Sequence, residues 1–195
     1  MMTASCYSTI GPFFLAPLVD GCGDLTHASG RTARGQHIVL AGRIVEEGGK
    51  PVLNSIIEIW QPDAAGVFAH PLDPRSSEAD PGFRGWGRSR SNAEGRFEFR
   101  TVLPGASQEP NGAVRCPHIN LTVLAIGVTR RLVTTIFFAD RPESVNDAVL
   151  NCVTDPALRQ RLFAVRDTTL DAAGIPGYRF DITLRGDNET PFFLD

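Results

Sequence analysis

Tyrosine is scarce in this sequence, which has two tyrosines against twelve phenylalanines in its 195 residues. A site that needs several phenolate oxygens is therefore hard to assemble from it. An excess of one charge is also lacking, because 19 basic residues stand against 22 acidic ones and the formal net charge is −3. That balance offers no basic face to nucleic acid or to an anionic membrane. No apolar run approaches the roughly 20 residues of a membrane-spanning helix, and we expect a soluble chain.

Cysteines are few and widely spaced. Cys6, Cys22, Cys116 and Cys152 form no C-x-x-C pair. A disulfide framework in a secreted protein remains open, but the first residues lack the basic region of a signal peptide and are interrupted by prolines. We therefore expect reduced thiols and a cytoplasmic location.

The common catalytic motifs are missing as well. The sequence has no G-x-S-x-G elbow, no glycine-rich phosphate loop and no H-E-x-x-H pair. None of its four histidines is spaced from another as metal ligands usually are. By motifs alone the chain is typical of a binding or structural domain.

The hydrophobic pattern predicts a mostly β fold in one domain. Residues 1–36 have no regular period and predict an irregular N-terminal arm, and residues 37–195 predict a single antiparallel β-sandwich with long loops and one or two short helices. Glycine-containing turns predict two hairpins, 37–45 with 53–60 and 84–90 with 96–102. Further strands are expected at 118–126, 132–138 and 178–185.

One helix is expected after Asp155, which is a suitable N-cap for a helix with Pro156 at its first position. Leu158, Leu162 and Val165 would lie on one stripe of this helix. Because the flanking strands are expected to pair antiparallel, the helix should cover the sheet without forming a parallel β-α-β unit.

Five short segments in order resemble the intradiol ring-cleavage dioxygenases, and together they span nearly the whole chain. They are Thr9–Pro12, Glu58–Gln61 with the turn 63–66 after it, Phe99–Gly105, Arg115–Asn120 and Tyr178–Gly186. In that family the segment matching Arg115–Asn120 reads R-P-x-H-x-H. The resemblance implies a β-sandwich that cleaves catechols with O₂.

The resemblance also implies where the iron ligands of this family would lie. Two tyrosines and two histidines hold Fe(III), whose hardness suits phenolate oxygens. The equivalent residues, called here the four ligand positions, are Phe68, Ser107, His118 and Asn120. Three of the four donors are thus replaced, and neither Tyr7 nor Tyr178 is placed to substitute easily. We expect that this chain binds no iron.

In lacking these donors, the chain resembles the α subunits of the protocatechuate 3,4-dioxygenases. In those enzymes a β subunit holds the Fe(III), and the α arm lines the substrate pocket; the matching residues are Thr9, Gly11 and Pro12, although such a trio could simply form a turn. Trp60 and Arg115 match residues that surround the iron in β, and here we expect them to pack around a vestigial pocket. Thr135 stands where these α subunits carry a pocket arginine, which leaves the particular catechol open.

The resemblance implies that this chain is a subunit with no activity of its own. It would complete the active site of a β subunit that holds Fe(III). The pair would cleave protocatechuate, or a related 4-substituted catechol, to 3-carboxy-cis,cis-muconate within a higher αβ oligomer. The alternative from another class is a non-enzymatic β-sandwich interaction module. A third possibility is an intradiol homologue whose iron has moved to new ligands.

Overall fold

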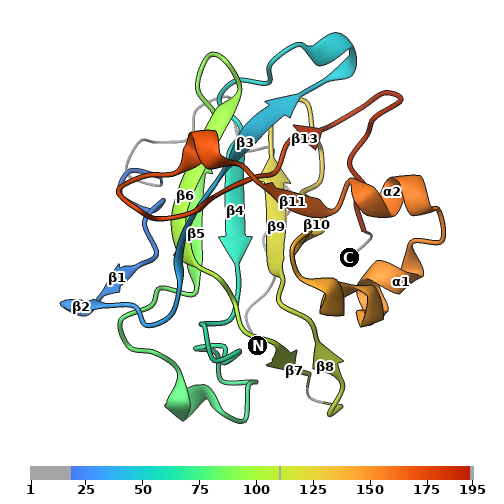
Figure 1. The fold of residues 1–195 in the computed structure, drawn as a ribbon. Helices are drawn as coiled ribbons and strands as arrows, with labels where there is room; N and C mark the ends of the chain where they lie inside the picture. Colours follow the sequence, from blue (N-terminus) through green and yellow to red (C-terminus); the bar gives the residue numbers. More distant parts are fainter. Residues whose placement is uncertain (1–18, 110, 194–195) are drawn as a thin grey trace, which may run out of the picture.

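A curled sheet forms the body of the protein (Figure 1). The structure, a computed structural model, describes residues 19–109 and 111–193. Among these residues the main sheet has nine strands: β3 (His37–Val45), β4 (Ile56–Trp60), β5 (Trp86–Arg90), β6 (Arg96–Val102), β9 (Ile119–Leu124), β10 (Leu132–Phe138), β11 (Phe163–Arg166), β12 (Gly177–Arg179) and β13 (Ile182–Thr183). The shorter elements are β1 (His27–Ala28) with β2 (Arg31–Thr32), β7 (Ser107–Gln108) with β8 (Val114–Arg115), and the helices α1 (Ala148–Cys152) and α2 (Pro156–Gln160).

The order of strands follows from the pairing of β3. Strand β6 occupies one edge of β3 along positions 37–43, so β12 and β13 must share the other edge. From β12 the sheet continues through β11, β10, β9 and β4 to β5. The two terminal strands, β5 and β6, nevertheless lie next to each other, so the sheet curls back on itself.

Residues 22–25 lie in the seam between those two terminal strands. The backbone N–H of Arg88 in β5 donates to the carbonyl of Cys22 at 3.1 Å, and that of Arg100 in β6 donates to Gly23 at 2.8 Å. The backbone N–H of Leu25 donates to the carbonyl of Arg100, and the Leu25 side chain is fully buried. The last part of the predicted arm is therefore built into the sheet, while the boundary between the arm and the β-sandwich at residue 36, within one domain, stays a prediction.

One hydrophobic core fills the inside of the curl, with a small second cluster beneath the helices. Phe97, Phe99 and Thr101 are buried while the residues between them are exposed, as the alternation in 96–102 predicts. Buried side chains from β3 and β6 join those from β4, β9 and β10 in a single cluster. The predicted mostly β fold with one or two short helices is confirmed.

Both predicted hairpins are wrong beyond their turns. The 46–51 turn closes through a bond from Val52 to Ile44 at 3.0 Å, but β3 then pairs with β6 while β4 pairs with β5 and β9. The 92–95 turn likewise closes, yet β5 and β6 share no ladder. Turn chemistry is local, whereas the choice of partner depends on the other strands that fill the sheet.

The expectation that all strands pair antiparallel near the helix is also wrong. Strands β10 and β11 are parallel, with Phe137 opposite Phe163, and the helices α1 and α2 lie in the connection between them (Figure 1). Asp155 caps α2 as predicted, accepting from the N–H of Ala157. The helix ends at Gln160, because the carbonyl of Leu162 accepts from Phe137 and draws the chain into β11. Val165 then lies on β11, half exposed, and not on a helical stripe.

Three of the predicted site residues, Thr9, Gly11 and Pro12, lie outside the described residues. Of the helices in the described part, none combines the length and apolar character needed to cross a membrane.

Gly42 in β3 lies where the chain passes from β12 to β13. A methyl group at this position would meet the carbonyl oxygen of Phe180 at 1.8 Å and the ring of Phe97 at 3.1 Å. We predict that Gly42→Ala lowers the free energy of unfolding by more than about 2 kcal/mol, because backbone blocks the added methyl. Urea denaturation measures this loss.

Gly23→Ala is the matched control. Its methyl would make only ordinary contacts at 3.4 and 3.7 Å, and neither glycine has a positive φ. The control should change the free energy of unfolding by less than about 1 kcal/mol. Equal effects from the two substitutions would contradict the close approach at Gly42.

Candidate functional site

The outer face of β9, together with the residue just before the strand, carries two of the four ligand positions. Ile119, Leu121 and Val123 point into the core, so His118 and Asn120, two residues apart, share the opposite face. Asn120 lies directly opposite Trp60 of β4 on one side and Thr135 of β10 on the other. The Thr135 hydroxyl lies 3.4 Å from Asn120 Oδ1, to which it donates.

Phe68 reaches the same face from the loop after β4. Its ring lies 4.9 Å from that of Trp60, and its backbone N–H donates to Asp73 Oδ2 at 2.9 Å. Buried Asp63 shapes the preceding turn by accepting from the N–H groups of Ala65 and Val67. The turn after Trp60 therefore holds Phe68 against Trp60, on the sheet face that also carries Asn120.

Beside these residues the sheet face is hollowed into a groove of about 480 Å³. Asn120 of β9 lines this groove. The side chains of Trp60 and Trp86, which are 45% and 46% exposed, border it. An ion pair between Glu58 and Arg88, 2.5 Å long, lies along the same wall. The two half-exposed indoles lie opposite each other in the β4–β5 ladder and give the groove an apolar border.

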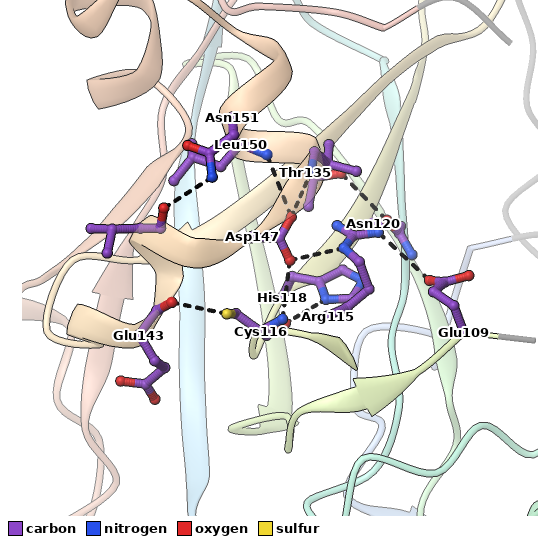
Figure 2. Close-up of polar contacts among 12 residues, drawn as sticks. Glu109, Arg115, Cys116, His118, Asn120, Thr135, Glu143, Asp147, Leu150 and Asn151 are labelled. Atoms are coloured by element: carbon purple, nitrogen blue, oxygen red, sulfur yellow. Dashed lines mark hydrogen bonds and ion pairs between the residues drawn. The ribbon is translucent and has the colours of Figure 1, made fainter. Parts of the chain in front are cut away.

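Ser107 and Arg115 face each other across the small β7–β8 ladder. Ser107 is buried, and its hydroxyl has no hydrogen-bond partner among the described residues. Arg115 donates through Nε to Asp147 Oδ2 at 2.8 Å, and its Nη1 lies 3.7 Å from Glu109 (Figure 2).

Asp147, which the sequence reasoning did not single out, is the centre of this network (Figure 2). It is fully buried, caps α1 through the N–H groups of Val149 and Leu150, and also accepts from the N–H of Cys116 at 3.0 Å. Burial alone would raise the pKa of this carboxyl group, but Arg115 and the backbone donors together lower it below its usual value. An aspartate before an Ala-Val-Leu run is an N-cap signal that could have revealed it.

His118 lies next to this network and is also buried. Its Nδ1 is 2.7 Å from the carbonyl oxygen of Cys116, so Nδ1 carries the proton because a carbonyl can only accept. The ring packs near Phe137, with centroids 6.4 Å apart. Desolvation and the nearby Arg115 charge lower the pKa of His118 to about 4, and the imidazole is neutral near pH 7.

These side chains do not fit a ferric ion. Phe68 has no donor atom, Ser107 and Asn120 offer neutral oxygens, and only His118 retains a ligand of the usual kind. Elsewhere in residues 19–109 and 111–193, no group of three or more His, Cys, Asp or Glu side chains is arranged to hold a metal ion.

Comparison with known proteins shows the family of the chain. Residues 10–186 match the family described as Dioxygenase, so the chain belongs to it. It is 41% identical over 162 residues to the protocatechuate 3,4-dioxygenase beta chain of Burkholderia cepacia, covering 80% of this chain and 68% of that one. It is 34% identical over 197 residues to the alpha chain of the same organism, covering 95% and 94%.

A third relative, the alpha chain from Pseudomonas putida, is 32% identical over 83% of this chain and 77% of its own length. Within the family the chain is thus an intradiol dioxygenase relative that resembles the α chains, as the motifs predict. Catechol 1,2-dioxygenase from Acinetobacter sp. ADP1 superposes with a TM-score of 0.64 at 23% identity, covering 100% of this chain and 68% of that one. At that identity the structural likeness supports the fold alone.

The pKa of His118 predicts how stability depends on pH. Since the folded pKa is about 4 and an unfolded histidine titrates near 6.5, the unfolded chain binds the extra proton between these values. The contribution of His118 to the free energy of unfolding should therefore be fully present above pH 6.5. It should be lost as the pH drops towards 4, by an amount on the order of 3 kcal/mol.

Urea denaturation across this range measures the slope. His118→Gln should lower overall stability but flatten the dependence on pH between 6.5 and 4. His27→Gln, which alters an exposed histidine, is the control and should keep the wild-type slope. An unchanged slope in His118→Gln would show that His118 is not held neutral in the fold.

Proposed function

We propose that the chain is the iron-free, α-type subunit of a heteromeric protocatechuate 3,4-dioxygenase. In this proposal it completes the active site of a β subunit that holds Fe(III). The pair cleaves protocatechuate, or a related 4-substituted catechol, with O₂ to 3-carboxy-cis,cis-muconate, and this chain alone is inactive. The observation that carries the proposal is the loss of three of the four donors in a chain of this family.

The structure supports this proposal because most of the four ligand positions have other contacts. The ring of Phe68 packs at a tilt against Trp60, Asn120 accepts from Thr135, and His118 is a neutral side chain hydrogen-bonded to the carbonyl of Cys116 just before β9. Arg115, which resembles a residue beside the iron in β, is committed to Asp147. These contacts favour a vestigial pocket over a metal centre with rearranged ligands.

Sequence identity alone does not separate α from β type, because the Burkholderia cepacia beta chain is more identical and the alpha chain of that organism is matched over more of its length. The donor set favours the α type. A β-type chain needs its own iron, and Phe68 and Ser107 supply no phenolate.

The groove beside Asn120 also favours contact with a partner chain. Aromatic side chains are enriched in the buried centres of protein interfaces, and obligate interfaces bury about 2,000–5,000 Å². Trp60 and Trp86 are half exposed on one sheet face, which favours a subunit covered by another chain. A stand-alone interaction module, the rival from another class, is less compatible with membership of this family. We place the complex in the cytoplasm on the sequence features alone.

Substrate recognition in this proposal involves the arm and β10. Thr9, Gly11 and Pro12 line the substrate pocket of the partner. Thr135 is buried on β10 and bonded to Asn120, so no arginine extends from this position towards an anionic substrate group. For that reason the proposal includes, as an alternative substrate, a 4-substituted catechol other than protocatechuate.

The first test concerns iron and the partner. The chain purified alone should contain far less than one iron per chain and show no visible tyrosinate-to-iron absorption, because both phenolates are replaced. Co-expressed with a homologue that keeps two tyrosines and two histidines, it should co-purify as a complex whose iron and activity depend on that partner. Stoichiometric iron in this chain alone, measured by metal analysis, would overturn the assignment to α type.

The second test concerns the arm. In the assembled enzyme, Gly11→Val should lower kcat/KM by up to roughly a hundredfold, because added bulk displaces the substrate. Thr9→Val should have a smaller effect, since it removes one hydrogen bond of about 0.5–1.5 kcal/mol. Iron content and assembly should be unchanged in both. If Gly11→Val assembles, keeps its iron and turns over at the wild-type rate, the arm is not part of the pocket.

A further inference from the structure

A second groove, with a volume of about 310 Å³, lies at the seam between the two terminal strands of the sheet. Residues 22–25 fill the seam beside Arg88 and Arg100, and this groove opens further along, towards the 91–95 turn. Four arginines from four different strands line it: Arg43 of β3, Arg90 of β5, Arg96 of β6 and Arg179 of β12.

The groove is positively charged, whereas the chain as a whole has a small net negative charge. The protein carries 19 basic and 22 acidic residues, yet the only carboxylate lining the groove in the described residues is Glu98. Two further carboxylates touch lining residues: Asp167 accepts from Arg179 Nε at 2.7 Å, and Asp181 accepts from the backbone N–H of Arg43 at 2.8 Å. Four guanidinium groups against three carboxylates leave a local excess of positive charge.

The contacts of the arginines show where this excess lies. Arg43 donates through Nε to the uncharged carbonyl of Glu94 at 3.0 Å, which leaves its two terminal nitrogens without a bond to the described residues. The side chains of Arg90 and Arg96 make no hydrogen bond or ion pair within residues 19–109 and 111–193. Three cations therefore border one hollow with their donors largely unused.

The register of the sheet brings two of these cations together. Arg43 and Arg96 lie directly opposite each other in the β3–β6 ladder. Like charges in directly opposite positions destabilise a sheet, and an anion between them would reverse that effect. Guanidinium groups match phosphate and carboxylate oxygens with paired, charge-assisted hydrogen bonds.

We propose that this groove binds a small multivalent anion that carries phosphate or carboxylate groups. Its volume is at the lower end of the range of about 300–1,000 Å³ that small-molecule sites occupy. The site uses strands β3, β5, β6 and β12, and it shares no residue with the four ligand positions. It therefore does not depend on the assignment of the chain as an α-type subunit.

Isothermal titration of the full chain, with any partner that co-purifies, tests the proposal. The probes are inorganic pyrophosphate and citrate in low-salt buffer, where screening is weak. We expect saturable binding of at least one probe at one site per chain. Binding of pyrophosphate alone identifies a phosphate ligand, and binding of citrate identifies a carboxylate ligand.

Variants locate the site. Arg96→Gln and Arg90→Gln should each weaken binding about tenfold, because each removes a charged donor from the groove. Arg31→Gln, an equal loss of charge at an exposed position on β2, should leave the affinity within about twofold of wild type. Circular dichroism checks that the exposed substitutions preserve the fold. Absence of saturable binding by both probes, or equal weakening by Arg31→Gln, would overturn the proposal.

Discussion

The buried ion pair between Arg115 and Asp147 holds together the parts of the structure on which the candidate site depends. Asp147 accepts from Arg115, from Cys116 and from the first turn of α1, so its buried charge is fully hydrogen-bonded. Removing one member of such a pair typically costs about 3–5 kcal/mol, because the other charge is left buried and unpaired. The pair fixes the entry to β9, and thereby His118, against the crossover between β10 and β11 (Figure 2).

Under the proposed function, this arrangement explains how a vestigial site can hold its side chains in place without a metal. In an iron centre, ligand bonds would orient the side chains. Here the orientation comes from contacts that need no metal: the tilted ring contact of Phe68 with Trp60, the Thr135 hydroxyl at Asn120 and the Cys116 carbonyl at His118. A wall with that rigidity suits a subunit that shapes a neighbouring pocket, as the proposed function requires.

The sequence was sufficient for the features that depend on short-range patterns. Alternation in 96–102 and 178–183 predicts which side chains are buried, and the cap at Asp155 marks the start of a helix. Strand partners could not be predicted, because β3 and β4 are joined by a closed turn and yet do not pair with each other: Arg43 of β3 lies opposite Arg96, and Trp60 of β4 lies opposite Asn120. Asp147 was missed for a related reason, since its importance arises from Arg115, which is distant in sequence. The ligand positions came from resemblance to a family, and spacing alone would not have identified Phe68 or Ser107.

The seam filled by residues 22–25 has a consequence for solubility. Terminal strands of an open sheet expose backbone donors and acceptors that can pair with another molecule and start aggregation. Here the short segment bonds to Arg88 of β5 on one side and Arg100 of β6 on the other, so part of each edge is covered from within the chain. The last part of the arm predicted from the sequence thus acts as edge protection for both terminal strands.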